Sequence, residues 1–241
     1  MKFDDIKKLQ QKKYREAFGY FLVEGEHLIL ELQKAAASNA ALAASQLYVT
    51  EKFAQWPSAF KTHVIHERQL AQIAETQTPQ GIVALVPTAA LQKNGAQSLK
   101  RAIYLHEVQD PGNLGAILRT LAWFGNTRCL LSPDSVDPFN AKVVRASMGA
   151  IFHVPLELDV PLASLSTRFE RIACLDMQGD NVQMPDFKSH ECFVFGNEAR
   201  GLPHTELAAL AARPFVIAGG GAIESLNLAA AVNICMYELN R

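Results

Sequence analysis

Short apolar runs alternate with longer segments of mixed polarity along most of the chain. In the first part, four apolar runs predict strands at residues 21–23, 47–50, 63–66 and 81–86. The segments between them are compatible with helices, one of which begins near Glu24. This alternation predicts a small α/β unit that ends at Pro87.

The same alternation resumes after residues 91–100, where small and polar residues predict a linker. Beyond it, almost wholly apolar runs predict strands at residues 102–108, 128–131, 171–177, 192–195 and 215–218. Helix-compatible runs occupy residues 113–124, 140–152, 161–169, 205–212 and 225–240. Strands without a polar face predict a parallel sheet that helices cover on both faces. We therefore expect two domains, residues 1–90 and 101–241.

Residues 4–19 have a helical pattern with a narrow apolar side and an unusual density of cations. The cationic side chains are Lys7, Lys8, Lys12, Lys13 and Arg15. A charge run on a helix is most often a solvated face. The net charge of the 241-residue chain is only −1, however, so any nucleic-acid contact must come from a local basic patch. A solvated face and a phosphate-contacting surface both remain open for these five side chains.

The four cysteines lie far apart, each in an apolar run: Cys129, Cys174, Cys192 and Cys235. We expect buried thiols in a reducing compartment, not disulfides or metal ligands. The histidines have no zinc-ligand spacing, so no metal site is predicted. The sequence shows neither a signal peptide nor an apolar stretch of about 18 residues, which predicts a cytoplasmic protein without a membrane partner.

Three glycine-containing loops directly follow predicted strands in the second half, at residues 110–119, 195–203 and 219–227. Ligands of parallel sheets bind beyond the carboxyl ends of the strands, so we expect the three loops to form one site. In the first loop, Asn113 is predicted to cap a helix on which Arg119 points away from the apolar face. On this helix alone, a solvated surface arginine is a better explanation of Arg119 than a binding role.

The other two loops also have simple structural explanations when each is taken alone. Glu198 is the carboxylate between Gly196 and Gly201, in what could be an ordinary turn. The glycine run at 219–221 could cradle a phosphate, and Ser225 could cap the following helix. Neither a Walker motif nor a Gly-x-Gly-x-x-Gly after the first strand is present, which argues against NTPase and Rossmann-type dinucleotide sites.

Taken together, the loops resemble the SpoU (TrmH-like) family of RNA ribose 2′-O-methyltransferases, within the SPOUT superfamily. The pattern Asn-x-Gly-x-x-x-Arg-[Ser/Thr] occurs at 113–120, and Phe-Gly-Asn-Glu-x-x-Gly-Leu occurs at 195–202. The pattern Ile-Pro-x-x-Gly-x-x-x-Ser-Leu-Asn occurs at 217–227, with Ala218 in place of the proline. Residues 6–25 and 78–82 resemble the ribosomal-protein-like RNA-binding domain that often precedes this catalytic domain.

The resemblance implies methylation of a ribose 2′-hydroxyl in RNA, with S-adenosylmethionine as cofactor and ribosomal RNA as the favoured substrate. It implies catalytic roles for Arg119, Asn113, Glu198, Ser225 and Asn227. It implies cofactor contacts from Gly196, Asn197, Ile217, Ala218, Gly219 and Leu226. It also implies a C-terminal trefoil knot in the SPOUT fold, a homodimer with its active site near the interface, and no need for a metal.

Within this resemblance we expect Arg119 to grip a phosphate and stabilise the developing alkoxide, because a guanidinium is too weak an acid to serve readily as a base. Glu198 is expected to orient Arg119 or a substrate hydroxyl, and Asn113 to orient the ribose or Arg119. The alternatives are methylation of tRNA, methylation of a base, a non-catalytic RNA-binding protein of the same fold, and a nucleotide-binding metabolic enzyme.

Overall fold

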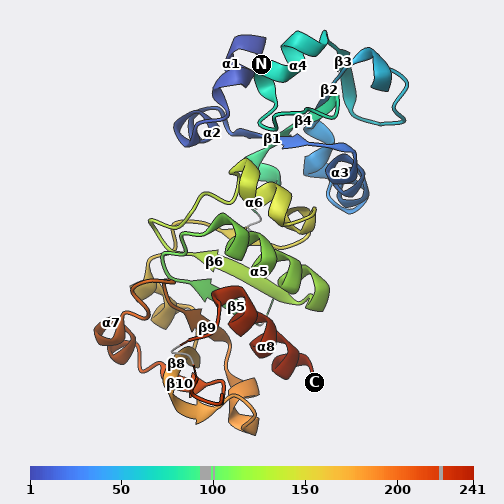
Figure 1. The fold of residues 1–241 in the computed structure, drawn as a ribbon. Coiled ribbons are helices and arrows are strands. Elements are labelled where there is room, and N and C mark those ends of the chain that lie inside the picture. Colours follow the sequence, from blue (N-terminus) through green and yellow to red (C-terminus); the bar gives the residue numbers. More distant parts are fainter. Residues whose placement is uncertain (93–98, 100, 223–224) are drawn as a thin grey trace. The chain divides into compact units, whose positions relative to one another are not determined.

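The computed structural model describes residues 1–92, 99, 101–222 and 225–241, and the chain divides into two compact units (Figure 1). Unit 1 consists of Met1–Gln92 and Asp137–His153, and unit 2 of Lys93–Val136 and Val154–Arg241. Most of the predicted linker lies outside the described residues. The alternating pattern did not indicate that residues 137–153, which lie within the predicted second domain, pack with the N-terminal part of the chain.

Unit 1 contains a four-stranded sheet in the order β1-β4-β2-β3. Its strands are β1 (Tyr20–Glu24), β2 (Gln46–Val49), β3 (Lys61–Val64) and β4 (Ile82–Pro87). β4 is antiparallel to both β1 and β2, whereas β2 and β3 are parallel. The helices are α1 (Phe3–Lys8), α2 (Lys12–Phe18), α3 (Glu26–Ser38), α4 (Glu67–Ile73) and α6 (Ala141–Ala146). All four predicted strands are present, within one or two residues at each end.

The prediction of one helix over residues 4–19 was wrong, because the chain turns between α1 and α2. Leu9 ends α1 and is buried together with Ile6, in the same cluster as Leu22 and Leu70. A continuous helix would keep its apolar residues in one narrow stripe along its axis. The turn after Leu9 instead lets Ile6 and Leu9 both pack into the core. Gly19 ends α2 with φ 71°, the left-handed conformation that favours glycine.

Unit 2 contains a six-stranded sheet in the order β10-β8-β9-β5-β6-β7, and its paired strands are all parallel. Its strands are β5 (Arg101–Leu105), β6 (Thr127–Leu131), β7 (Leu156–Glu157), β8 (Ile172–Asn181), β9 (Cys192–Phe195) and β10 (Arg213–Val216). The helices are α5 (Pro111–Phe124), α7 (His204–Ala209) and α8 (Leu228–Asn240). The predicted parallel sheet is thus confirmed.

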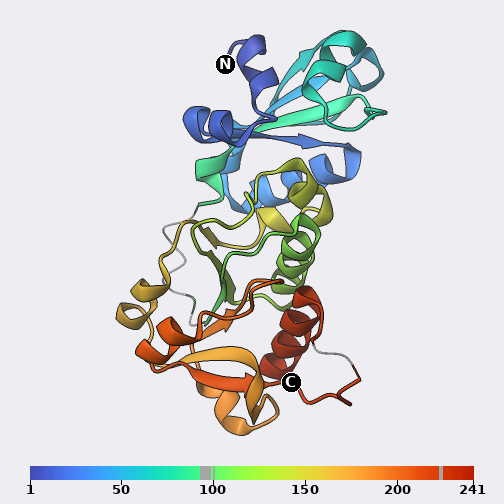
Figure 2. The ribbon, with the colours of Figure 1, turned by 60° about the vertical axis from the view of Figure 1, so that its left-hand side comes forward.

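Helices cover both faces of this sheet, as predicted (Figure 2). On one face, α7 and the short 3-10 helix at Leu162–Thr167 pack over Tyr104, Leu130 and Val194. On the other face, α5 and α8 lie side by side. The hydroxyl of Tyr104 donates to the carbonyl of Val160 at 3.0 Å, which satisfies the one polar atom of a fully buried ring.

Several predicted element boundaries were wrong for identifiable backbone reasons. The helix expected at 140–152 ends early, because Met148 and Gly149 have φ values of 50° and 89°. The segment 161–169 forms a 3-10 helix, and the two-residue edge strand β7 was too short to detect. No helix in the described ranges is long and apolar enough to cross a membrane. The trefoil knot stays a prediction of the family resemblance.

Candidate active site

The three glycine-containing loops extend from strands of the unit 2 sheet. β5 and β9 are neighbours, with Leu105 paired to Phe195, so residues 106–110 and 196–203 leave the same sheet edge together. β8 separates β10 from β9, and residues 217–227 lead from β10 to the start of α8. Because α8 packs beside α5, its first turn lies at the site that the other two loops form.

The amide side chain of Asn113 connects all three loops. Its Nδ2 donates to Oε1 of Glu198 at 3.1 Å, and its Oδ1 accepts from Nδ2 of Asn227 at 2.9 Å. These bonds join residues that are 85 and 114 positions apart in the sequence. The structure thus brings three of the five predicted catalytic residues into one hydrogen-bonded chain.

Glu198 also holds the backbone of the first loop. Its carboxylate accepts from the N–H groups of Gln109 and Asp110 at 3.1 and 3.3 Å. A carboxylate that accepts several N–H donors forms strong, charge-assisted bonds and fixes the loop that supplies them. We expected Glu198 to orient Arg119 or a substrate hydroxyl; the described residues show no bond between the side chains of Glu198 and Arg119, and the contact with a substrate hydroxyl stays a prediction. Glu198 instead orients Asn113 and the loop before it.

The predicted helix caps were wrong at both helices of the site. Asp110 caps α5, since its Oδ1 accepts from the N–H of Asn113 at 2.7 Å. Pro111 follows at the first helical position, where its missing N–H costs nothing. Asn227, not Ser225, caps α8 through bonds from the N–H groups of Ala229 and Ala230. Asn113 therefore lies inside the helix, and its side chain is available for the contacts with Glu198 and Asn227.

Arg119 lies on α5 and is exposed, whereas Leu114, Ile117, Leu118 and Leu121 on the same helix are buried. Helical periodicity predicted this orientation correctly. Within the described ranges, no hydrogen bond or ion pair engages its guanidinium. A planar, permanently charged fork of donors on the first helix of the site is thus available to a ligand with anionic oxygens.

The loop after β9 is held rigidly by Asn197 and two glycines. Asn197 and Gly201 form two backbone hydrogen bonds of 2.9 Å, and the Oδ1 of Asn197 accepts from the N–H groups of Ala199 and Arg200. A Cβ at Gly196 would lie only 2.5 Å from the carbonyl carbon and oxygen of Gly201. Glycine is therefore required at 196, and the side chain of Asn197, predicted to contact the cofactor, shapes the loop.

Glu107 is a site residue that the sequence reasoning missed. It follows β5 with φ 50°, an uncommon backbone conformation for a side chain of this type. Its carbonyl accepts from Nδ2 of Asn197 at 2.6 Å, its carboxylate pairs with Arg200, and its N–H donates to Ser132. One residue thus connects the first loop to the loop that carries Glu198. The strand predicted at residues 102–108 extends past the observed end of β5 at Leu105, so the prediction placed Glu107 inside a strand and concealed its position in the loop.

The residues predicted to contact the cofactor around the third loop form an open, partly apolar surface. Leu226 is 45% exposed, Ile217 is half-buried, and Ala218 and Gly219 are exposed. A Cβ added at Gly219 or Gly220 would meet nothing within 4 Å, so the backbone there is accessible. Exposed apolar side chains beside free peptide groups fit a purine ring and its ribose. The residues present therefore fit an adenosine-containing cofactor.

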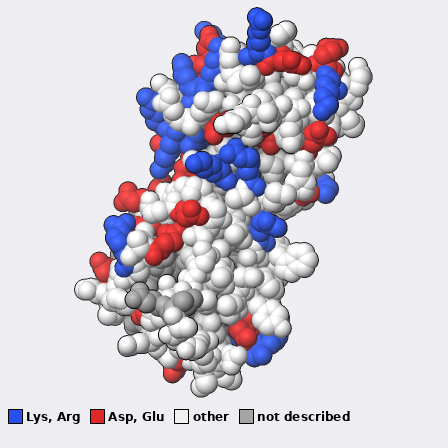
Figure 3. All heavy atoms as spheres, in the orientation of Figure 1, with Lys and Arg blue, Asp and Glu red and all other residues white. Residues whose placement is uncertain are grey.

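The predicted RNA-contacting cations divide into two groups. Lys7, Lys8, Lys12 and Lys13 belong to α1 and α2, where Figure 3 shows a gathering of cationic atoms. Arg15 does not fit the prediction, because its side chain is only 5% exposed and pairs with Asp137, with Nη2 at 2.7 Å from Oδ2. It also donates to the carbonyl of Leu9 at 2.7 Å, so it holds the turn between the two helices.

Both parts of the chain match models of known protein families. Residues 100–237 match the SpoU rRNA Methylase family, and residues 2–84 match the MRM3-like substrate binding domain. The 23S rRNA (guanosine(2553)-2′-O)-methyltransferase RlmP of Bacillus subtilis is 30% identical, over 99% of this chain and 95% of that relative.

Solved structures with the same fold include a putative RNA methyltransferase of the TrmH family from Porphyromonas gingivalis, with a TM-score of 0.82 and 28% identity. That match covers 99% of this chain and 96% of the other. An AdoMet-bound rRNA methyltransferase from Sinorhizobium meliloti has a TM-score of 0.82 and 26% identity, over 98% and 93% of the two chains. The chain therefore belongs to the SpoU rRNA methylase family, as its three sequence motifs predicted.

Proposed function

We propose that this methyltransferase transfers the methyl group of S-adenosylmethionine to a ribose 2′-hydroxyl of ribosomal RNA. The observation that carries the proposal is the hydrogen-bonded chain Glu198–Asn113–Asn227, with Arg119, which has no partner among the described residues, on the same helix as Asn113. Family membership supports the reaction class, and the open surface around Leu226 and Gly219 suits the adenosine part of the cofactor.

When bound, S-adenosylmethionine supplies an activated methyl group whose leaving group is a neutral thioether. The residues of this chain must then align the ribose hydroxyl in line with that methyl group and stabilise its oxygen as the proton leaves. Arg119 suits the second task, because its guanidinium is exposed and has no partner among the described residues. Asn113 suits the first task, because its amide is held in place from both sides.

Ribosomal RNA is preferred over transfer RNA as the substrate on two grounds. The relative RlmP and the Sinorhizobium meliloti protein are named as rRNA methyltransferases. The chain also carries a substrate-binding domain with a lysine-rich surface in addition to its catalytic domain. A phosphate-contacting surface suits a large structured RNA, on which contacts to the backbone set position and register.

We also propose a homodimer that is built on α5 and α8. The bond between Asn113 and Asn227 joins the first turns of these helices, and each carries a large exposed aromatic ten residues further on. Trp123 is 86% exposed and Tyr237 is 58% exposed, with Ile234 partly exposed beside it. Large exposed aromatic side chains are enriched at protein interfaces. The arrangement would place the C-terminal ends of both helices against a second copy, about 15 Å along each helix from the active-site end.

The reaction is tested by mapping ribose methylations across total RNA of the source organism with and without the gene. We expect the loss of one 2′-O-methyl mark in ribosomal RNA, and the purified protein should restore it on RNA from the deletion strain. Loss of a mark in transfer RNA would show that transfer RNA, not ribosomal RNA, is the substrate. An unchanged map together with no methyl transfer in vitro would contradict the proposed reaction.

The role of Arg119 is tested by two substitutions in the same assay. Arg119→Ala should lower kcat about 10²- to 10³-fold, the usual effect of removing one group that stabilises a developing oxyanion. Arg119→Lys keeps the positive charge but lacks the planar, paired N–H donors of the guanidinium. Its kcat should therefore be only slightly higher than that of Arg119→Ala. Calorimetric binding of S-adenosylmethionine should be unchanged in both variants. Full turnover with lysine would show that the fork geometry is not needed.

A further inference from the structure

Residues 137–153 lie within the region that matches the methylase family, yet they form part of unit 1. Asp137 forms its ion pair with Arg15 in a nearly buried position, where the two side chains are 10% and 5% exposed. Phe139 packs on Phe21, with ring centroids 4.9 Å apart. Helix α6 thus packs on β1, and Asp137, four residues before the helix, is tied to Arg15 of α2 within the same compact unit.

The cations of α1 and α2 are largely neutralised by their own helices. Lys7 pairs with Asp4 at 2.8 Å, Lys8 with Asp5 at 2.8 Å, and Lys12 with Glu16 at 3.6 Å. Surface pairs of this kind are weak, but they reduce the net positive charge of the face.

Helix α6 differs from α1 and α2 in its charge balance. Residues 138–153 contain Lys142 and Arg145 and no carboxylate. Lys142 is exposed, and no ion pair engages it within the part of the chain that the structure describes.

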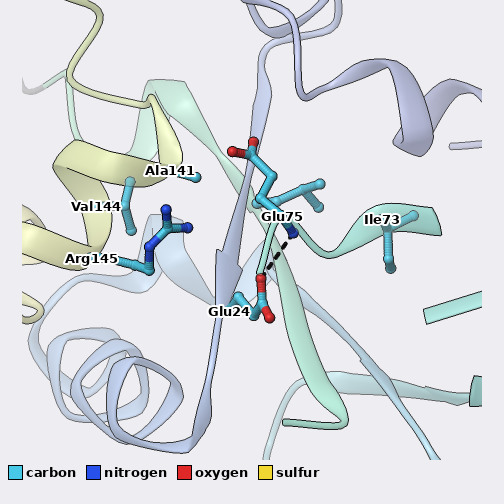
Figure 4. A pocket seen from close by; sticks show the side chains of 7 residues that line it. Glu24, Ile73, Glu75, Ala141, Val144 and Arg145 are labelled. Carbon is cyan, nitrogen blue, oxygen red and sulfur yellow. Dashed lines mark hydrogen bonds between the residues drawn. The ribbon is translucent and has the colours of Figure 1, made fainter. Parts of the chain in front are cut away.

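The cations of α6 and the turn between α1 and α2 both lie close to residues 74–75 of unit 1. Arg145 and Glu75 line one small pocket, together with Glu24 (Figure 4). Burial raises the pKa of Glu75, and the nearby Arg145, Arg15 and Lys142 oppose that rise. Gln10, in the turn, donates to the carbonyl of Ala74 at 3.3 Å. Lys and Arg atoms accordingly gather over α1, α2 and α6 in one view of unit 1 (Figure 3).

Arg145 and Lys142 are not equally available to a ligand. Arg145 is half-buried and its guanidinium faces the pocket with two carboxylates, so Glu24 and Glu75 compete for it. Lys142 forms no ion pair among the described residues, although its charge, like that of Arg145, acts on Glu75. A flexible ammonium that no described residue pairs with, on a helix packed in the core of the unit, is well suited to contact a phosphate as a point charge.

We propose that Lys142 contacts a phosphate of the RNA substrate, so that α6 completes the RNA-binding face that α1 and α2 begin. The inference rests on the proposed function and adds to it. The RNA-binding face is then not made by the N-terminal domain alone, because a segment from within the methylase sequence contributes to it. Contacts of this kind are to the sugar-phosphate backbone and carry no base specificity.

The test compares Lys142→Gln with Lys61→Gln in the full-length protein. Lys61 is also exposed, but it lies on β3, at the opposite edge of the four-stranded sheet from β1, where α6 packs. Binding of a short fluorescent RNA hairpin is measured by polarisation over a series of salt concentrations. Each lost phosphate contact should lower the slope of log K against log salt by about one.

We expect Lys142→Gln to bind several-fold more weakly at low salt, with a slope about one unit lower, and Lys61→Gln to match the wild type. Thermal unfolding of both variants should be unchanged, since both side chains are exposed. A Lys142→Gln protein with wild-type affinity and slope would overturn this inference and leave the proposed reaction standing. A wild-type protein that binds no RNA probe would overturn both.

Discussion

Asn113 has more contacts across the site than its position in a helix would suggest. Replacing it with alanine removes the bonds to Glu198 and Asn227 but leaves the Asp110 cap of α5 in place. We expect kcat to fall on the order of 10²-fold, because misplaced catalytic groups cost about that much. The free energy of unfolding should change by less than about 1 kcal/mol.

Asp110→Ala is the matched variant for this prediction. It removes the cap and should lower the free energy of unfolding by about 1 kcal/mol, since N-caps typically contribute that amount. Methyl-transfer kinetics and urea unfolding on both variants separate the two effects. If Asn113→Ala loses as much stability as Asp110→Ala, its role is structural and the prediction fails.

Position 196 must be glycine for a steric reason. Gly196→Ala would place a Cβ 2.5 Å from backbone atoms of Gly201, so the loop that carries Glu198 must shift. We expect a loss of about 1–3 kcal/mol in the free energy of unfolding, together with a lower rate of methyl transfer. Gly220→Ala is the control for stability, because its Cβ would meet nothing within 4 Å. Equal stability of the two variants in urea unfolding would contradict the prediction.

The sequence motifs predicted which residues lie close together better than they predicted what those residues contact. Asn113 was assigned as a cap because its type and place fit, but Asp110 takes that role with Pro111 behind it. Its bonds to Glu198 and Asn227 join positions 85 and 114 apart, which no local pattern reveals. Glu107 was missed for the same reason, because its partner Arg200 is 93 positions away.

At the scale of elements, the buried pair Arg15–Asp137 decides where α6 lies. Arg15→Met leaves a buried carboxylate without its partner, and Asp137→Leu leaves a buried guanidinium. Each should lower the free energy of unfolding by about 3 kcal/mol, because removing one member of a buried pair strands the other charge. The double variant should lose less than the sum of the two, as measured in a double-mutant cycle. Additive losses would show that the two side chains are not coupled.

The strands were predictable because each is a short apolar run, and their parallel order follows from the alternation with helices. The place of residues 137–153 was not predictable in this way. It depends on an ion pair between positions 122 apart and on Phe139 packing against Phe21. The break between α1 and α2 likewise comes from burial of Leu9 and not from a glycine or proline.

At the scale of the whole molecule, the four cysteines are all free and buried, as the apolar runs predicted. Burial raises the pKa of Cys174 to about 11 and of Cys129 to about 12, and it raises those of Cys192 and Cys235 as well. Only thiolates react with disulfide reagents. The native protein should therefore show almost no thiol reaction at about pH 8, and four reactive thiols in denaturant.

The sign of the pH effect follows from the same pKa shifts. A thiol whose folded-state pKa lies above its ordinary value of 9.0 stays protonated while the unfolded chain begins to ionise. Its contribution to stability is therefore complete below pH 9.0 and is lost as the pH rises further. A fast native reaction of any one thiol at about pH 8 would contradict its burial.

Dimer formation through α8 can be tested separately from the chemistry of methyl transfer. Tyr237→Glu places a charge on the exposed side of α8, ten residues from the Asn227 cap, so the local site contacts should persist in the monomer. We expect sedimentation or light scattering to show a dimer for the wild type and a monomer for this variant, because a buried unpaired charge strongly disfavours association. Met177→Glu, on the exposed part of β8, is the matched control and should remain dimeric.

If the Tyr237→Glu variant stays dimeric, α8 does not form the interface. If it becomes monomeric and retains full methyl transfer, the second copy contributes nothing to the reaction, and the active site is complete within one chain.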